Sequence, residues 1–134
     1  MSKPLFLALT LALVAAACER PDPGIRSRQL AGQVLRGTLA YPRSAMLGVS
    51  AGADAAELRM ASPDSAPAIA AWFRTTLSLN GWQLEHDAVN REGAIVIYAE
   101  QGKRPLWITV RPNSGGPGAT YTMIGAVVEG DSIR

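Results

Sequence analysis

SPDSAPAIAAWFRTTLSLNGW, residues 62–82, is the stretch that decides the fold, because it contains a helix with its own start and stop signals. Asp64 is the expected N-cap, since a carboxylate there accepts hydrogen bonds from the free N–H groups of the first turn. Pro67 falls where a missing N–H costs little. Asn80-Gly81 is expected to end the helix, because glycine accepts the left-handed backbone that a helix C-terminus requires.

This helix presents one apolar face to a neighbouring layer. The members of that face follow the spacing i, i+3, i+4 and i+8, and they are Ile69, Trp72, Phe73 and Leu77. Trp82 follows the helix end directly and is expected to fold back onto the last turn. A helix with such a face must bury it against a sheet or another helix.

Strand-like segments flank the helix on both sides. Residues 46–50 and 56–61 precede it and are joined by a Gly52-Ala53-Asp54 turn; in the second of them Leu58 and Met60 alternate with polar residues. Four more follow, at residues 82–88, 94–100, 106–111 and 120–128, with short polar turns that favour antiparallel hairpins. The longer connection at 112–118 is rich in glycine. The sequence therefore predicts an α+β fold, an antiparallel sheet of five to six strands with one amphipathic helix on one face, in the order ββαββββ.

The chain divides into four predicted parts. Residues 1–17 are a signal peptide, 18–38 a tether, 39–130 the α+β domain and 131–134 a short tail. In the tether Pro21, Pro23 and Gly24 break regular structure, although a short helical turn around residues 27–35 is an alternative. Its arginines outnumber its acidic residues, and a solvated linker is favoured over contact with anionic lipid head groups.

The predicted signal peptide ends at Cys18, the single cysteine of the chain. Lys3 precedes an apolar run over residues 4–17, which is too short for a transmembrane helix of about 20 residues. A positive start, an apolar core and small residues before a cleavage point are the parts of a secretory signal. A plain signal cut after Ala17 would leave a free exported thiol, which is a liability in an oxidising compartment.

Val14-Ala15-Ala16-Ala17-Cys18 resembles the lipobox of bacterial lipoproteins, although Ala15 stands where leucine is usual. The resemblance implies that Cys18 carries diacylglycerol, that the leader is cut before it, and that the new amine receives an acyl chain such as palmitate. Glu19 in place of aspartate resembles the pattern of lipoproteins sent to the outer membrane, facing the periplasm. The membrane is then the expected partner. The folded part loosely resembles small bacterial envelope domains of uncharacterised function, a likeness that brings no catalytic residues.

Composition and motifs argue against an enzyme and against a bound cofactor. The chain has 13 Lys and Arg against 11 Asp and Glu, a near-neutral balance that gives no support for nucleic-acid binding. His86 is the single histidine, so no His/Cys metal cluster is expected. Asp87 beside it points to the opposite face of a strand, and no serine has the spacing of a nucleophile elbow. The loop at 113–118 lacks the Gly-Lys-Ser/Thr ending of a phosphate-binding loop.

The candidate binding surface is aromatic. Trp107 is out of phase with the apolar positions around it, so it is expected on the exposed sheet face with Tyr98 or Tyr121. The favoured hypothesis is a non-enzymatic envelope lipoprotein whose domain binds a protein or wall component, or supports an assembly. The alternative is a carrier or sensor of a small apolar ligand held between helix and sheet. An enzyme is the least favoured.

Overall fold

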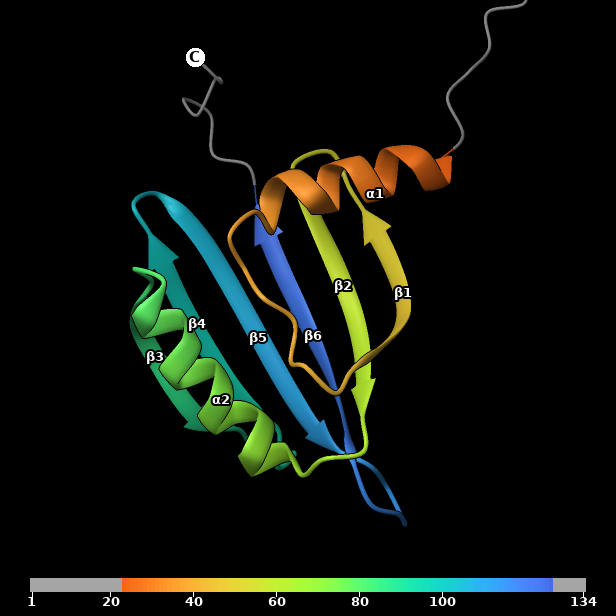
Figure 1. Cartoon of the computed structure of the whole chain (residues 1–134), viewed down its shortest axis with the longest axis vertical. Coiled ribbons are helices and arrows are strands. Elements are labelled where there is room, and N and C mark those ends of the chain that lie inside the picture. Colours follow the sequence, from red (N-terminus) through yellow and green to blue (C-terminus); the bar gives the residue numbers. More distant parts are fainter. Residues whose placement is uncertain (1–22, 127–134) are drawn as a thin grey trace, which may run out of the picture.

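In the computed structural model the described residues are 23–126, and they form two helices and six strands (Figure 1). In chain order these are α1 (Pro23–Val34), β1 (Ala45–Ala51), β2 (Ala55–Ser62), α2 (Ala66–Leu79), β3 (Gln83–Val89), β4 (Ile95–Gln101), β5 (Arg104–Pro112) and β6 (Ala119–Ala126). The strands make one antiparallel sheet in the order β1-β2-β6-β5-β4-β3. The α+β class and the hairpins between sequential strands are confirmed.

The expectation of a single helix is wrong, because part of the predicted tether forms α1. Ala31 and Val34 on this helix are buried, and Leu30 and Leu35 pack beside them. Pro23 stands at the first helical position, where proline is tolerated. Pro23 and Gly24, which argue for a tether, therefore mark a helix start instead, and Pro21 lies outside the described residues. The described order is αββαββββ.

Both helices cover the same face of the sheet (Figure 1). α1 lies across one end of β1, β2 and β6, whereas α2 runs along β3, β4 and β5. The chain between α1 and β1 passes between the two helices on that face. The opposite face carries no helix of the described chain.

The core lies between α2 and the sheet. Ile69, Phe73 and Leu77 are buried as the helix periodicity predicts, and Trp82 is only 3% exposed after the helix end. Edge-to-face ring contacts continue from this core, with centroids 5.0 Å apart for Trp72 and Phe73 and 5.3 Å for Phe73 and Tyr121. Such pairs add to the free energy gained from burial. Trp72 itself is half-buried.

The helix cap differs from the expected one by a single residue. Ser65, not Asp64, is the N-cap of α2, and its hydroxyl accepts from the Ala68 N–H at 3.3 Å. The Asp64 carboxylate instead accepts from the Tyr41 hydroxyl at 2.6 Å and from Arg43 at 2.7 Å. Two side chains of the preceding loop thus outcompete the helix N–H groups for Asp64. At the other end Gly81 has a φ of 79°, as a helix C-terminus requires.

An ion pair ties α2 to β3. Arg74 on the helix donates two hydrogen bonds to the Asp87 carboxylate, which lower the pKa of Asp87 below its ordinary value. Asp87 points to the helix side because a β-bulge follows Leu84 and shifts the register of the strand. The signal peptide, Cys18 and the last predicted strand residues, Val127 and Val128, lie outside the described residues.

Candidate functional site: a cavity beneath α1

α1 is held against the sheet by a small apolar cluster separate from the main core. Ala31, Val34 and Ala56 are buried in it, and Leu30 and Val49 pack at its margin. Most of these side chains are small, so the helix backbone approaches the strands closely. α1 therefore covers this end of the sheet through a smaller apolar cluster than the core beneath α2.

Gly125 on β6 lies directly against the C-terminal end of α1. A Cβ atom at this position would lie 2.9 Å from the Val34 carbonyl oxygen and 3.2 Å from the Leu35 side chain. Real Cβ contacts are longer than 3.0 Å, so a residue with a side chain would displace the end of α1. The position needs glycine because of this contact.

Arg104 secures the C-terminal end of α1. Its guanidinium donates to the carbonyl oxygens of Val34 at 3.1 Å and Arg36 at 2.7 Å, two groups that the helix end leaves without intrahelical partners. The same guanidinium lies 5.4 Å from the centre of the Trp82 ring. The Arg104 side chain therefore links the end of α1 to the β4–β5 turn and to Trp82, which follows α2.

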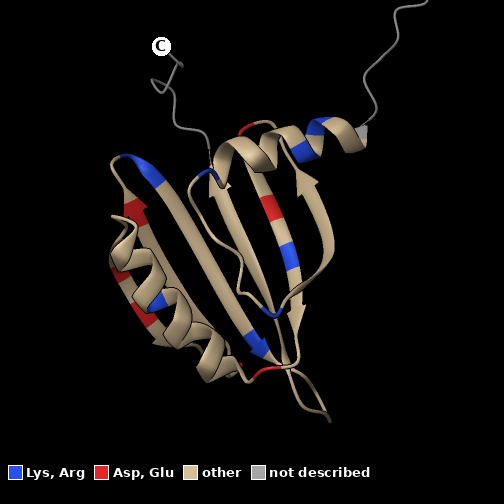
Figure 2. Cartoon of the chain, in the orientation of Figure 1, with Lys and Arg blue, Asp and Glu red and all other residues tan. Residues whose placement is uncertain are grey.

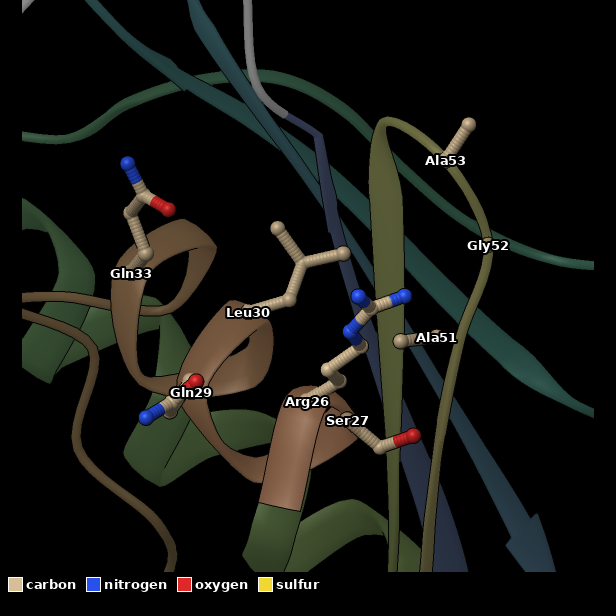
Figure 3. A pocket seen from close by; sticks show the side chains of 8 residues that line it. All are labelled: Arg26, Ser27, Gln29, Leu30, Gln33, Ala51, Gly52 and Ala53. Carbon is tan, nitrogen blue, oxygen red and sulfur yellow. The ribbon is translucent and has the colours of Figure 1, made fainter. Parts of the chain in front are cut away.

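A cavity of about 570 Å³ lies between α1 and the turn that joins β1 to β2 (Figure 3). The lining residues come from one face of the helix and from the turn, and they are Arg26, Ser27, Gln29, Leu30, Gln33, Ala51, Gly52 and Ala53. Arg26 and Leu30 extend from α1 towards Ala51 (Figure 3). Its volume falls within the range of small-molecule sites, which is about 300–1,000 Å³.

The chemistry of the lining is amphipathic. Leu30 and the methyl groups of the turn supply apolar surface, while the helix supplies two amides and a hydroxyl. Arg26 is the single charged residue among the eight, and no carboxylate shares the lining. The arrangement suits a ligand with an apolar body and an anionic or strongly accepting group.

A second hollow of about 490 Å³ lies at the other end of β1 and β2, lined by residues 42–45 and 61–63. Its one charged side chain is Arg43, which is already held by the Asp64 carboxylate at 2.7 Å. Ser44 is also engaged, through a 2.7 Å hydrogen bond with the Tyr121 hydroxyl. The polar groups of this hollow are thus committed within the protein, which makes it the weaker site.

The space between α2 and the sheet, where the alternative hypothesis expects a small apolar ligand, is filled by side chains. Ile69 and Phe73 are fully buried and pack against residues of β4, β5 and β6. The cavity lies under the other helix instead. Arg26 and Leu30 therefore replace the face of α2 as candidate ligand contacts.

The aromatic surface predicted from the sequence is present in part. Trp107 is 40% exposed on the helix-free face and is stacked on Tyr98, with ring centres 5.0 Å apart. The Tyr98 hydroxyl donates to Glu100 at 2.5 Å, which raises the pKa of Tyr98. Tyr121 does not belong to this surface: it is 1% exposed on the helix side, where its hydroxyl accepts from the Tyr41 N–H at 3.0 Å.

His86 lies exposed on the edge strand β3, opposite Tyr98. Within residues 23–126 no group of three or more His, Cys, Asp or Glu side chains is placed to hold a metal ion. In the same range no helix has the length and apolar character needed to cross a bilayer.

Residues 43–118 match the model of a protein family described as START domain-like. The match begins just before β1 and ends just before β6, so it covers the first five strands and α2. No curated protein and no solved structure matches the chain.

Proposed function

We propose that this chain, which belongs to the START domain-like family, is a small-ligand-binding module whose site is the cavity beneath α1. The observation that carries the proposal is the cavity itself, a hollow of about 570 Å³ whose lining combines apolar side chains with one guanidinium. A site of this kind orients an amphipathic ligand, because its apolar part contacts the apolar side chains and its charged part contacts the guanidinium. Arg26 is the proposed counter-ion and Leu30 the proposed apolar contact.

We further propose that the module is a non-enzymatic lipoprotein of the cell envelope, attached through an acylated Cys18 to the outer membrane and facing the periplasm. Cys18 stands five residues before Pro23, the first residue of α1. Five extended residues span at most about 18 Å. The cavity would then be held close to the bilayer surface.

The ligand proposal is tested with two related probes, anilinonaphthalene sulfonate and the uncharged phenylnaphthylamine. We expect the sulfonate to bind more tightly, and Arg26→Ala to weaken its binding about tenfold, because a charge-assisted hydrogen bond is worth about 1.5–3 kcal/mol before solvent exposure reduces it. Leu30→Ala is expected to weaken both probes. Fluorescence titration measures each dissociation constant.

Trp107→Ala is the matched control, since it removes an exposed ring from the opposite face of the sheet. It should leave both dissociation constants unchanged. If Trp107→Ala abolishes binding while the α1 variants retain it, the binding surface is the helix-free face, as the protein- or wall-binding hypothesis requires. Equal binding of the two probes, unaffected by Arg26→Ala, would contradict the assignment of Arg26.

The anchor is tested by Cys18→Ala in the full chain. We expect the wild-type protein to fractionate with membranes and its mature N-terminus to carry acyl mass, because two or more acyl chains give stable anchoring. The variant should move to the soluble fraction. A wild-type N-terminus without acyl mass, together with identical fractionation of the variant, would show that Cys18 is not an attachment point.

A further inference from the structure

α1 has an outward face that the sheet does not cover. Helical spacing places Ile25 and Gly32 on the side opposite the buried Ala31 and Val34, with Arg28 at the margin of that side. Ile25 is 48% exposed, and the Arg28 side chain is exposed beside it. An apolar side chain and a guanidinium therefore share one solvent-facing stripe.

α1 and the turn after it are basic. Residues 23–37 include three arginines and no acidic residue, whereas the β1–β2 turn across the cavity carries Asp54. Within residues 23–126 no carboxylate forms an ion pair with Arg26, Arg28 or Arg36. Lys103 is exposed in the β4–β5 turn, and its neighbour Arg104 reaches the C-terminal end of α1 through its hydrogen bonds. Figure 2 shows basic residues on α1 itself. Free positive groups thus gather around one helix.

We infer that this outward face of α1, with Ile25 and Arg28, docks on a bilayer surface rich in anionic phospholipids, together with Arg36 in the turn that follows the helix. Two observations favour a bilayer over an acidic protein. An exposed isoleucine lies one helical turn from Arg28, so an apolar contact with the head-group region can accompany the charge, and the chain preceding α1 leads within five residues to Cys18. The inference depends on the proposed anchor only to bring the domain near a membrane. The contact itself comes from charge and from the apolar side chain, which act without acyl chains.

The binding free energy of this face is suited to orienting the domain on the bilayer more than to anchoring it there. Each arginine near an anionic surface contributes about 1 kcal/mol, a factor of about five in partitioning. Two arginines give a factor of about thirty, which is modest beside two acyl chains. Docking on this face lays α1 along the bilayer and turns the domain to one orientation at the surface.

The test uses residues 18–134 with Cys18→Ser, which include all of the described fold and carry no acyl chain. Co-sedimentation is measured with vesicles of phosphatidylcholine alone and with vesicles containing about one-third phosphatidylglycerol. We expect binding to the anionic vesicles only, lost on raising the salt concentration. Arg28→Glu with Arg36→Glu should weaken it at least tenfold.

Arg91→Glu is the matched control, because Arg91 is exposed in the β3–β4 turn at the opposite end of the sheet. It should leave vesicle binding unchanged, and thermal unfolding should be alike in all variants. Equal binding to both vesicle types, no binding to either, or equal loss with Arg91→Glu overturns the inference. Capture by poly-aspartate without vesicle binding also overturns it, by assigning the face to an acidic protein. Since no acyl chain is present, each of these outcomes leaves the Cys18 anchor to its own test.

Discussion

Phe73→Ala is expected to lower the free energy of unfolding by about 3–5 kcal/mol, a large part of what a domain of this size has. Phe73 is fully buried, and its ring contacts Trp72 and Tyr121 edge-to-face. Its removal leaves a cavity between α2 and β6 that rigid neighbours fill only in part. Thermal unfolding should show a Tm lower by about 15 °C or more.

Leu79→Ala is the control for this variant, because Leu79 lies on the same helix and is 81% exposed. Its effect should stay within about 0.5 kcal/mol. If Phe73→Ala does not fold, Phe73→Leu gives a smaller loss of about 1–1.5 kcal/mol on the same scale. A Phe73 variant as stable as the Leu79 variant would show that the α2–sheet core is wrongly described.

Gly125→Val is expected to separate α1 from the sheet at a cost of about 1–3 kcal/mol. Its Cβ would meet the Val34 carbonyl oxygen at 2.9 Å, although valine itself favours a strand. The loss therefore comes from the helix contact. Tryptic cleavage after Arg28 and Arg36 should become faster, and binding of the sulfonate probe should fall with it.

Gly116→Ala provides the comparison, since a Cβ there meets no atom within 4 Å. It should keep the wild-type cleavage rate and probe affinity. If Gly125→Val is cleaved at the wild-type rate, α1 tolerates a side chain between it and β6. The close contact between Gly125 and the end of α1 would then be wrong.

The α2 region was predictable because its signals are local. Apolar spacing gave the buried face, and Asn80-Gly81 gave the helix end. The cap was misassigned by one residue because Asp64 has partners, Tyr41 and Arg43, that lie more than twenty positions away in the sequence. No local rule reveals such competitors.

α1 was predicted only as an alternative, a short helical turn around residues 27–35, because it packs on the sheet through small residues. Ala31 and Val34 meet Ala56 and Gly125, so the contact depends on close backbone approach more than on a broad apolar face. The weak signal was the pair of Ala31 and Val34 beside Leu35. The cavity was unpredictable for the same reason, since its two walls meet only in the folded chain.

The prediction that Tyr121 lies on the exposed sheet face was wrong because the sequence did not decide which residues of β6 face the helices. The register pairs Tyr121 with the buried Val110 and places Met123 beside Ile108, so both side chains face the helices. Thr120 and Thr122 alternate with them on the other face. Those threonines were the signal that could have separated Tyr121 from Trp107.

The Arg104 contact gives the proposed ligand site a thermodynamic linkage. A ligand that touches both α1 and the β1–β2 turn binds only while α1 is packed on the sheet. Packing of α1 raises the ligand affinity, and ligand binding must therefore raise the population with α1 packed by the same factor. Arg104 biases that equilibrium from outside the cavity, because its guanidinium donates to carbonyl groups at the end of α1 and none of its hydrogen-bond partners, Gln101, Val34 and Arg36, lines the cavity. Amide hydrogen exchange in α1 would therefore report ligand occupancy at a distance from the ligand itself.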